Sequence, residues 1–318
     1  MRAVRITGPG TVEIAELDRP GQVAGEVLVE VACAAICSTD RKLVARGQLV
    51  GRVPGHEVAG RLADGTPVGV HPDTGCGRCA ACRRGQTNLC PDKQAVGIDR
   101  DGGLAQAVAV PAAHAVPLDG VPLAVAPLLE PLACCVHAVR RAGAFDGPAL
   151  VVGAGAMGLL LMWVLQAEGH RVAVCQRSPD RRARAAQLGA DAVLGPDDDV
   201  VASLGEPPAA VFVTAPGAEA LTWALERVAT AGVVHAFAGS PGGASVDANL
   251  VHYRHLTLVG STGSGLVDYA AAAELVRRGT VDLARLPVRR TDLAGASGAV
   301  TVPEPGSALR TVVDLEAP

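Results

Sequence analysis

Four cysteines lie within the fifteen residues CGRCAACRRGQTNLC. Thiolates separated by two residues can reach the same ion, and sulfur is a preferred ligand of tetrahedral Zn²⁺. The spacing therefore predicts one zinc ion bound by Cys76, Cys79, Cys82 and Cys90. With four sulfur ligands no position remains for water or substrate, so this zinc would stabilise its loop and take no part in catalysis. An iron–sulfur cluster and a redox dithiol pair are the alternatives.

Three further potential metal ligands precede this loop. Cys37 lies in ICSTD, and His56 and Glu57 lie in VPGHEVAG. A catalytic zinc is typically bound by a few protein ligands together with a water molecule. Taken singly, a cysteine beside an apolar run is more often in the core, and a histidine in a glycine-rich turn is more often on the surface. Their occurrence together, in order before the four-cysteine loop, favours a second metal site.

A glycine motif follows later in the chain. Gly153, Gly155 and Gly158, with Ala156 and Met157 between them, stand between an apolar strand and a helical pattern. Within a βαβ unit such glycines allow a tight turn and bring a pyrophosphate close to the helix N-terminus. The motif predicts a dinucleotide site. The uncharged stretch from 149 to 167 is then strand, loop and buried helix, and not a membrane span.

The residues after the second strand of this unit bear on the choice of cofactor. NAD enzymes usually place Asp or Glu there to bind the ribose hydroxyls, whereas this chain has Gln176. An acid would repel a 2′-phosphate, and Arg177, helped by Ser178, Arg181 or Arg182, can pair with one. We therefore expect NADP(H), with NAD(H) as the alternative. These arginines could also simply lie at an exposed helix start.

The elements that must position these residues can be read from apolar patterns. Strands are expected at 171–176, 209–215, 232–239 and 256–262, separated by helical patterns. Strands that alternate with helices predict a parallel, doubly wound α/β sheet. Aromatic residues make up only 2% of the 318 residues, so the cores must be built from Ala, Val and Leu. A chain of this length is expected to form two domains.

The net charge and the cysteine content of the chain indicate which binding partners and which cellular compartment to expect. A net charge of −4 gives no general attraction to nucleic acids or anionic membranes, so neither is an expected partner. The N-terminal MRAVRITGPGTVEIAELDRP has no apolar run of signal-peptide length, which predicts a cytoplasmic protein with reduced thiols. Four cysteines in apolar surroundings are expected to be buried structural thiols: Cys33, Cys134, Cys135 and Cys175.

The order of these motifs resembles the zinc-dependent medium-chain alcohol and polyol dehydrogenases, and the resemblance covers nearly the whole chain. It implies that Cys37 and His56 bind a catalytic zinc, that Glu57 is a ligand or lies next to the ligands, and that the four-cysteine loop binds a structural zinc. Glu130, in LLEPLA, is similar to the Glu of the sorbitol dehydrogenase branch that lies at or near this zinc. An acid in an apolar run also needs a cationic partner if it is buried; a water-exposed carboxylate at a helix start is the alternative.

The resemblance also implies the domain order and the reaction. A GroES-like, mostly β catalytic domain would comprise residues 1–130 and 263–318, and a Rossmann domain residues 131–262. The chain would form a homodimer or homotetramer. The expected reaction is hydride transfer between a secondary alcohol and NADP(H) or NAD(H), with zinc lowering the pKa of the alcohol. Thr39 would begin a proton relay, although a turn-stabilising threonine beside Asp40 is nearly as good an interpretation.

Two departures from the family pattern concern the substrate. Arg41 and Lys42 stand where polyol dehydrogenases often have a histidine, so the relay could end differently or Lys42 could meet an anionic substrate. The segment RLADGTPVGVHPDTG before the cysteine loop is short, which suggests an open cleft for a cyclitol, an amino sugar or a secondary-metabolite intermediate. The alternatives to a zinc enzyme are a cofactor-binding regulator and a zinc-free quinone-type reductase; the complete set of metal motifs argues against both.

Overall fold

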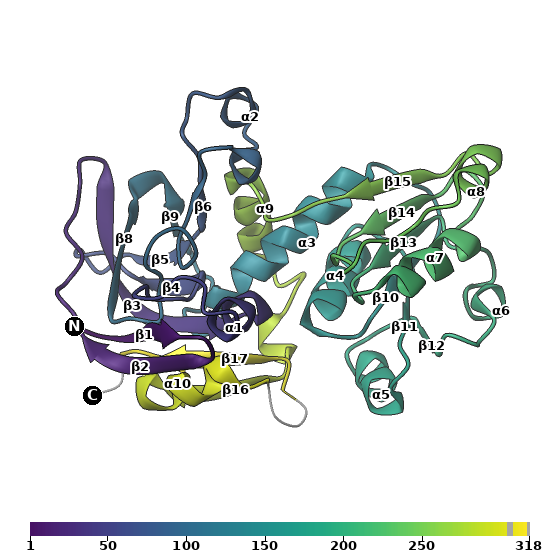
Figure 1. The fold of residues 1–318 in the computed structure, drawn as a ribbon. Coiled ribbons are helices and arrows are strands. Elements are labelled where there is room, and N and C mark those ends of the chain that lie inside the picture. Colours follow the sequence, from purple (N-terminus) through teal and green to yellow (C-terminus); the bar gives the residue numbers. More distant parts are fainter. Residues whose placement is uncertain (304–307, 317–318) are drawn as a thin grey trace. The chain divides into compact units, whose positions relative to one another are not determined.

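The computed structural model describes residues 1–303 and 308–316. The chain forms two compact units (Figure 1). Unit 1 comprises residues 1–133 and 263–318, and unit 2 comprises residues 134–262. The chain thus leaves unit 1, builds unit 2 and returns, and helix α3 (Leu129–Ala142) carries it across the first boundary.

Unit 1 is built on a mostly antiparallel sheet in the order β16-β17-β3-β4-β5-β9, with β8 also pairing with β3. Valine-rich strands supply its core, because β-branched side chains pack well on a pleated surface. Fully buried Val29, Val58, Val68 and Val110 belong to this core. The strands are β3 (Glu26–Ile36), β4 (Glu57–Arg61), β5 (Pro67–Val70), β8 (Ala107–Pro111), β9 (Ala115–Pro117), β16 (Val288–Asp292) and β17 (Arg310–Asp314).

Smaller elements complete unit 1. A hairpin of β1 (Arg2–Gly8) and β2 (Thr11–Glu16) and a short pair of β6 (Asp73–Thr74) and β7 (Gln94–Ala95) lie outside the main sheet. The four-cysteine segment is enclosed between β6 and β7 and contains α2 (Ala80–Arg83) and the 3₁₀ turn η1 (Thr87–Leu89). The other helices and turns are α1 (Ser38–Ala45), η2 (Ala112–His114), η3 (Ala126–Leu128), α9 (Leu266–Arg277), η4 (Leu283–Arg285) and α10 (Leu293–Thr301).

Unit 2 is a six-stranded parallel sheet in the order β12-β11-β10-β13-β14-β15. In this order successive strands are added on one side of β10 as far as β12, and then on its other side from β13 to β15, which is the pattern of a doubly wound dinucleotide fold and confirms the predicted fold class. The strands are β10 (Ala149–Val152), β11 (Val172–Cys175), β12 (Ala192–Leu194), β13 (Ala210–Val213), β14 (Val233–Ala236) and β15 (Thr257–Gly260). The helices are α4 (Ala156–Ala167), α5 (Pro179–Gln187), α6 (Val200–Leu204), α7 (Ala218–Arg227) and α8 (Ala248–Tyr253).

The uncharged stretch at 149–167 folds as β10, a glycine loop and α4, as expected. Helix α4 is apolar nearly all round, and nine of its twelve residues are accordingly buried. No helix in the described part of the chain is both long and apolar enough to cross a membrane. The observed strands are shorter than their apolar patterns; at the end of β13, for example, the N–H groups of Thr214 and Ala215 both donate to the Val152 carbonyl, which ends the ladder.

Candidate functional site

The ends of three neighbouring strands meet at one place in unit 1. In the antiparallel ladders of β3, Ala35 lies opposite Glu57 at the start of β4, and Ile36 lies opposite Thr311 on β17. The residues at these strand ends are thereby brought together although they are far apart in the sequence: Cys37, His56, Glu57 and Arg310.

Cys37, His56 and Glu57 form a cluster suited to a metal ion. One ligand atom of each lies within 4.8 Å of the others. Glu57 is fully buried, and among the described residues neither of its carboxylate oxygens has a hydrogen-bond partner. A buried carboxylate with unsatisfied oxygens is costly unless a cation takes them up. A thiolate, an imidazole and a carboxylate are all zinc ligands, so the donor set fits zinc.

Asp40 orients the histidine of this cluster. Its Oδ1 lies 3.1 Å from His56 Nδ1, and its Oδ2 accepts a 2.8 Å hydrogen bond from the Cys37 N–H. Because Nδ1 is engaged, Nε2 is the nitrogen left to bind a metal. Burial favours the neutral imidazole, but the charge and hydrogen bond of Asp40, together with Cys37, raise the pKa of His56 well above its usual value. Sequence reasoning treated Asp40 only as a neighbour of Thr39.

Arg310 is the second residue that the motifs did not reveal. It is nearly buried; its Nη2 lies 3.4 Å from Glu57 Oε1 and 3.9 Å from Cys37 Sγ. The guanidinium therefore offsets part of the negative charge of the cluster. No local signal marks this arginine, because its position depends on the pairing of β17 with β3.

The structure places the other two predicted residues as follows. Thr39 is half-buried on the first turn of α1, two residues beyond Cys37. Glu130 is buried in the first turn of α3. It is not among the three residues whose ligand atoms lie within 4.8 Å of one another in the described chain. Burial, followed by the charge of Glu130, raises the pKa of Tyr269, which shows that these two groups are neighbours.

The four cysteines of the β6–β7 segment form the second cluster. The four Sγ atoms lie within 4.8 Å of one another, and all four thiols are free. Two backbone N–H groups donate to sulfur, that of Cys76 to Cys90 at 3.3 Å and that of Cys82 to Cys79 at 3.4 Å. Backbone N–H groups of Arg78 and Cys79 lower the pKa of Cys76 to about 6. Such donors stabilise thiolates, the form that binds zinc. We call residues 75–93 the four-cysteine lobe.

The glycine motif joins β10 to α4 in unit 2. Gly153 has a φ of 111°, and its neighbour across the sheet is Thr214, whose hydroxyl donates to the Val152 carbonyl at 2.9 Å. A side chain on Gly158 would collide with the Gly153 carbonyl, so the turn can close only with glycine. Gly155 caps α4, which begins with Ala156 and Met157. This leaves the helix N-terminus open to an anionic group.

The predicted 2′-phosphate residues lie at the end of β11. Gln176 accepts a hydrogen bond from the Ala154 N–H at 3.3 Å, which places it beside the glycine loop. Ser178 caps α5 and accepts from the Arg181 N–H. Arg182 donates to the carbonyls of Gln176 and Arg177 at 2.8 and 2.9 Å, so it holds the turn together, while Arg177 is exposed.

Known protein families match both the part of the chain that carries the metal clusters and the part that begins with α4 after the glycine loop. Residues 23–120 match the family described as "Alcohol dehydrogenase GroES-like domain", and residues 156–278 match "Zinc-binding dehydrogenase". L-threonine 3-dehydrogenase of Pyrococcus horikoshii is 34% identical, with 89% of each chain covered. L-galactonate-5-dehydrogenase of Escherichia coli K12 is 31% identical, with 84% of each chain covered.

Solved structures agree as well. A zinc-binding dehydrogenase from Sinorhizobium meliloti, solved with NADP, has a TM-score of 0.90 at 28% identity over 98% of each chain. An alcohol dehydrogenase from E. coli CFT073, solved with NADH, has a TM-score of 0.91 and supports the fold at 24% identity over 99% of each chain. Motifs, fold and relatives agree, and the chain belongs to the zinc-dependent medium-chain alcohol and polyol dehydrogenase family, whose enzymes use zinc and a nicotinamide dinucleotide to interconvert secondary alcohols and ketones.

Proposed function

We propose that this enzyme oxidises a secondary hydroxyl group of a polyhydroxylated substrate, such as a polyol, a cyclitol, an amino sugar or a related secondary-metabolite intermediate, and reduces the matching ketone. The observation that carries this proposal is the buried Glu57 carboxylate, without hydrogen-bond partners in the described chain, beside Cys37 and His56. Relatives named for L-threonine, L-galactonate and D-altritol support a substrate with a secondary hydroxyl.

We assign the residues of the site the following roles. A zinc ion held by Cys37, His56 and Glu57 would supply the Lewis acidity that lowers the pKa of the alcohol. Asp40 fixes the imidazole of His56 so that Nε2 faces the metal position. Arg310 compensates the charge of Glu57. Thr39, on the same helix as Asp40, receives the hydroxyl proton and passes it towards solvent. We assign buried Glu130 as a further ligand or as a neighbour of the ligands.

We propose NADP(H) as the preferred dinucleotide. The turn after β11 has no carboxylate to repel a 2′-phosphate; instead it presents exposed Arg177 next to the capped start of α5. Arg182 supports this turn through the carbonyls of Gln176 and Arg177. The NADP complex of the S. meliloti relative supports the same preference.

We propose further that the chain forms a homodimer or homotetramer and works in the cytoplasm, where its nine thiols stay reduced. Strand β15 is the last strand of its sheet, and Leu258 on it is 40% exposed. An exposed sheet edge with an apolar side chain favours pairing with another chain. Light scattering on the purified protein measures the mass directly, and a monomer at micromolar concentration would contradict this assignment.

The function is tested by metal content and activity of matched cysteine variants. Protein purified without chelators should contain about two zinc ions per chain, one for each cluster. Cys37→Ser should lose one zinc and nearly all activity on a panel of polyols and cyclitols with NADP⁺. Cys33→Ser, at a buried cysteine of β3 that belongs to neither cluster, is the control and should keep both zinc ions and the activity. Unchanged turnover in Cys37→Ser would reject the zinc mechanism and favour a zinc-free reductase.

A further inference from the structure

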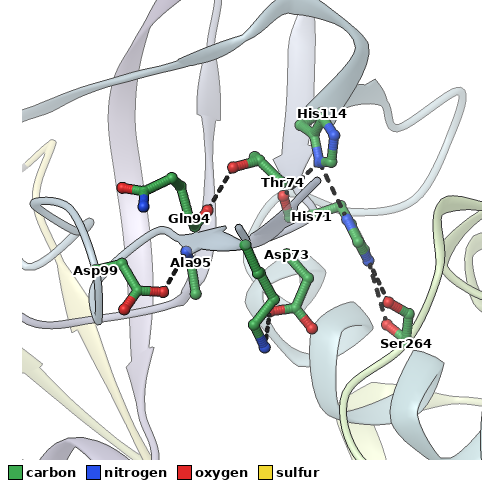
Figure 2. Close-up of polar contacts among 9 residues, drawn as sticks. His71, Asp73, Thr74, Gln94, Ala95, Asp99, His114 and Ser264 are labelled. Carbon is green, nitrogen blue, oxygen red and sulfur yellow. Dashed lines mark hydrogen bonds and ion pairs between the residues drawn. The ribbon is translucent and has the colours of Figure 1, made fainter. Parts of the chain in front are cut away.

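A second set of buried polar side chains contains no residue of the Cys37 cluster. Burying polar side chains costs free energy unless each finds a partner. The seven residues of this group surround the base of the four-cysteine lobe, and Figure 2 shows most of them: His71, Asp73, Thr74, Asn88, His114, Ser264 and Asp268. None of them belongs to the metal clusters, so the proposed reaction does not explain them.

Two backbone carbonyls fix the protons of the histidine pair. His71 Nε2 lies 3.0 Å from the Ser264 carbonyl oxygen, and His114 Nδ1 lies 3.1 Å from the His71 carbonyl oxygen. Both nitrogens must therefore donate. The remaining nitrogen of His71, Nδ1, lies 3.2 Å from His114 Nδ1 and must accept from it. The contacts of His71 with His114 and Ser264, drawn in Figure 2, are all satisfied only when His71 is neutral with its proton on Nε2. A second proton on His71 would place two donors against each other.

The residues held by this pair are those at which the chain re-enters unit 1 after β15. Space around them is so limited that side chains are excluded. A side chain on Gly263, which has a φ of 60°, would collide with the Asp73 carboxylate, and one on Gly265 would lie 2.9 Å from the Gly85 carbonyl. The Gly265 N–H donates to Asp268 at 2.9 Å, which caps α9. Residues 263–265 are thus enclosed between His71 and the lobe.

Asp73 and Thr74 of the same group connect the two ends of the four-cysteine lobe, which we call its base. Asp73 pairs with Lys93 at 3.0 Å, and the Thr74 hydroxyl donates to the Gln94 carbonyl across the β6–β7 pair (Figure 2). The lobe, the histidine pair and the start of α9 therefore share one set of contacts. A change at His71 acts on the start of α9 and on the lobe together.

We propose that His71 and His114 form a proton-sensitive clamp that holds residues 263–265, and with them the start of α9, against the base of the four-cysteine lobe. Protonation of His71 Nδ1 removes one of the two acceptors of His114 Nδ1, sets two N–H donors against each other at 3.2 Å and opens the clamp. The clamp is closed at neutral pH and opens on acidification.

The charges around His71 determine the pH range. Burial, and then the charge of His114, lower the pKa of His71 to about 4, from an ordinary value of about 6.5. Since the released histidine binds a proton more readily than the clamped one, clamping is at full strength above pH 6.5 and weakens as the pH falls towards 4. The groups that face His71 are His114, Asp73 with its partner Lys93, Asp268, and the edge-on ring of Tyr269. The carboxylates of Asp73 and Asp268 raise the pKa of His71, but by less than burial and His114 lower it.

Hydrogen exchange of the full-length, zinc-loaded protein tests the clamp. Opening of the 263–269 segment, corrected for intrinsic exchange, should increase about thirtyfold between pH 7.5 and pH 5, the ratio that proton linkage gives for the two pKa values. His71→Gln keeps a donor and an acceptor but cannot be protonated, so its exchange should not change in this way. His252→Gln, at an exposed histidine of α8, is the control and should behave like the unchanged protein.

Zinc loss at low pH does not confuse the comparison, because all three proteins carry the same four cysteines. Equal pH responses in the unchanged protein and His71→Gln, or no response in either, would overturn the clamp. If His71→Gln does not fold, the unchanged protein alone decides: opening must increase in 263–269 by far more than in the buried strand β3. A uniform increase over both segments would equally overturn it.

Discussion

Asp40 joins the two ends of the candidate metal site, because one carboxylate oxygen binds His56 Nδ1 at 3.1 Å and the other binds the Cys37 N–H at 2.8 Å. A third hydrogen bond, from the Gly55 N–H at 3.2 Å, fixes the turn before His56. One buried side chain thus sets the position of two metal ligands, Cys37 just after β3 and His56 just before β4. Partners of this kind orient the ligand and raise its basicity.

Asp40→Asn should therefore weaken zinc binding at the Cys37 cluster about 10-fold to 100-fold while sparing the four-cysteine lobe. Competition with a chelator of known affinity should show one zinc per chain retained where the unchanged protein retains two. Asp64→Asn is the matched control, since Asp64 lies in an exposed turn, where it accepts the Thr66 N–H. Full retention of both zinc ions in Asp40→Asn would contradict the orienting role.

Arg310→Gln should destabilise the metal-free protein by about 3–5 kcal/mol, since it leaves the buried Glu57 carboxylate without its cation. Zinc should reduce this loss, because the metal supplies the missing positive charge. Thermal unfolding with and without zinc measures the difference. Arg290→Gln, which breaks a half-exposed pair with Asp314, is the control and should cost about 0–1 kcal/mol in both states. Equal losses for the two variants would mean that Arg310 does not compensate Glu57.

Local patterns predicted the parallel sheet of unit 2 and the four-cysteine cluster, whereas the mostly β unit 1 and the grouping of Cys37, His56 and Glu57 were expected from the resemblance of the motif order to a known family. The four-cysteine lobe and the glycine loop are each formed within a few consecutive residues, so their spacing alone carries the information. The apolar strands of unit 2 were recognisable because a buried parallel sheet requires continuous apolar runs. Their ends were predicted too far out, since apolar residues such as Ala215 continue beyond the last ladder bond.

The residues that escaped prediction act through pairing between distant segments. Arg310 reaches Glu57 only because β17 returns to pair with β3, and no sequence spacing encodes that return. His71 meets Ser264 across a sequence separation of 193 residues. Asp40 could have been found, because an acid three residues after a helix N-cap commonly binds back to the cap N–H, as it does here with Cys37.

Arg177→Ala should raise KM for NADP⁺ about 10-fold or more and leave KM for NAD⁺ nearly unchanged, because only the 2′-phosphate needs the guanidinium. Steady-state kinetics with both dinucleotides at saturating substrate measures this ratio. Arg184→Ala, in the last turn of α5, provides the control on the same helix. An equal rise of KM for both dinucleotides would indicate a general effect on the fold, and no rise for either would remove Arg177 from the cofactor site.

His235→Phe should stabilise unit 2 and reduce its sensitivity to acid. His235 is fully buried on β14, stacked on Phe212 at 5.5 Å, and neither ring nitrogen has a hydrogen-bond partner within the described chain. A buried polar group without partners costs about 1–3 kcal/mol, which phenylalanine would recover.

The pH dependence of the same position gives a second measurement. Burial, and then the charge of His137, lower the pKa of His235 to about 4. The unfolded chain, with an ordinary pKa of about 6.5, takes up a proton first as the pH falls, so folding weakens between pH 6.5 and pH 4 by up to about 3 kcal/mol. The gain in melting temperature of His235→Phe over the unchanged protein should therefore be larger at pH 5 than at pH 7.5. A gain that is the same at both pH values would mean that His235 is protonated as readily in the folded protein as in the unfolded chain.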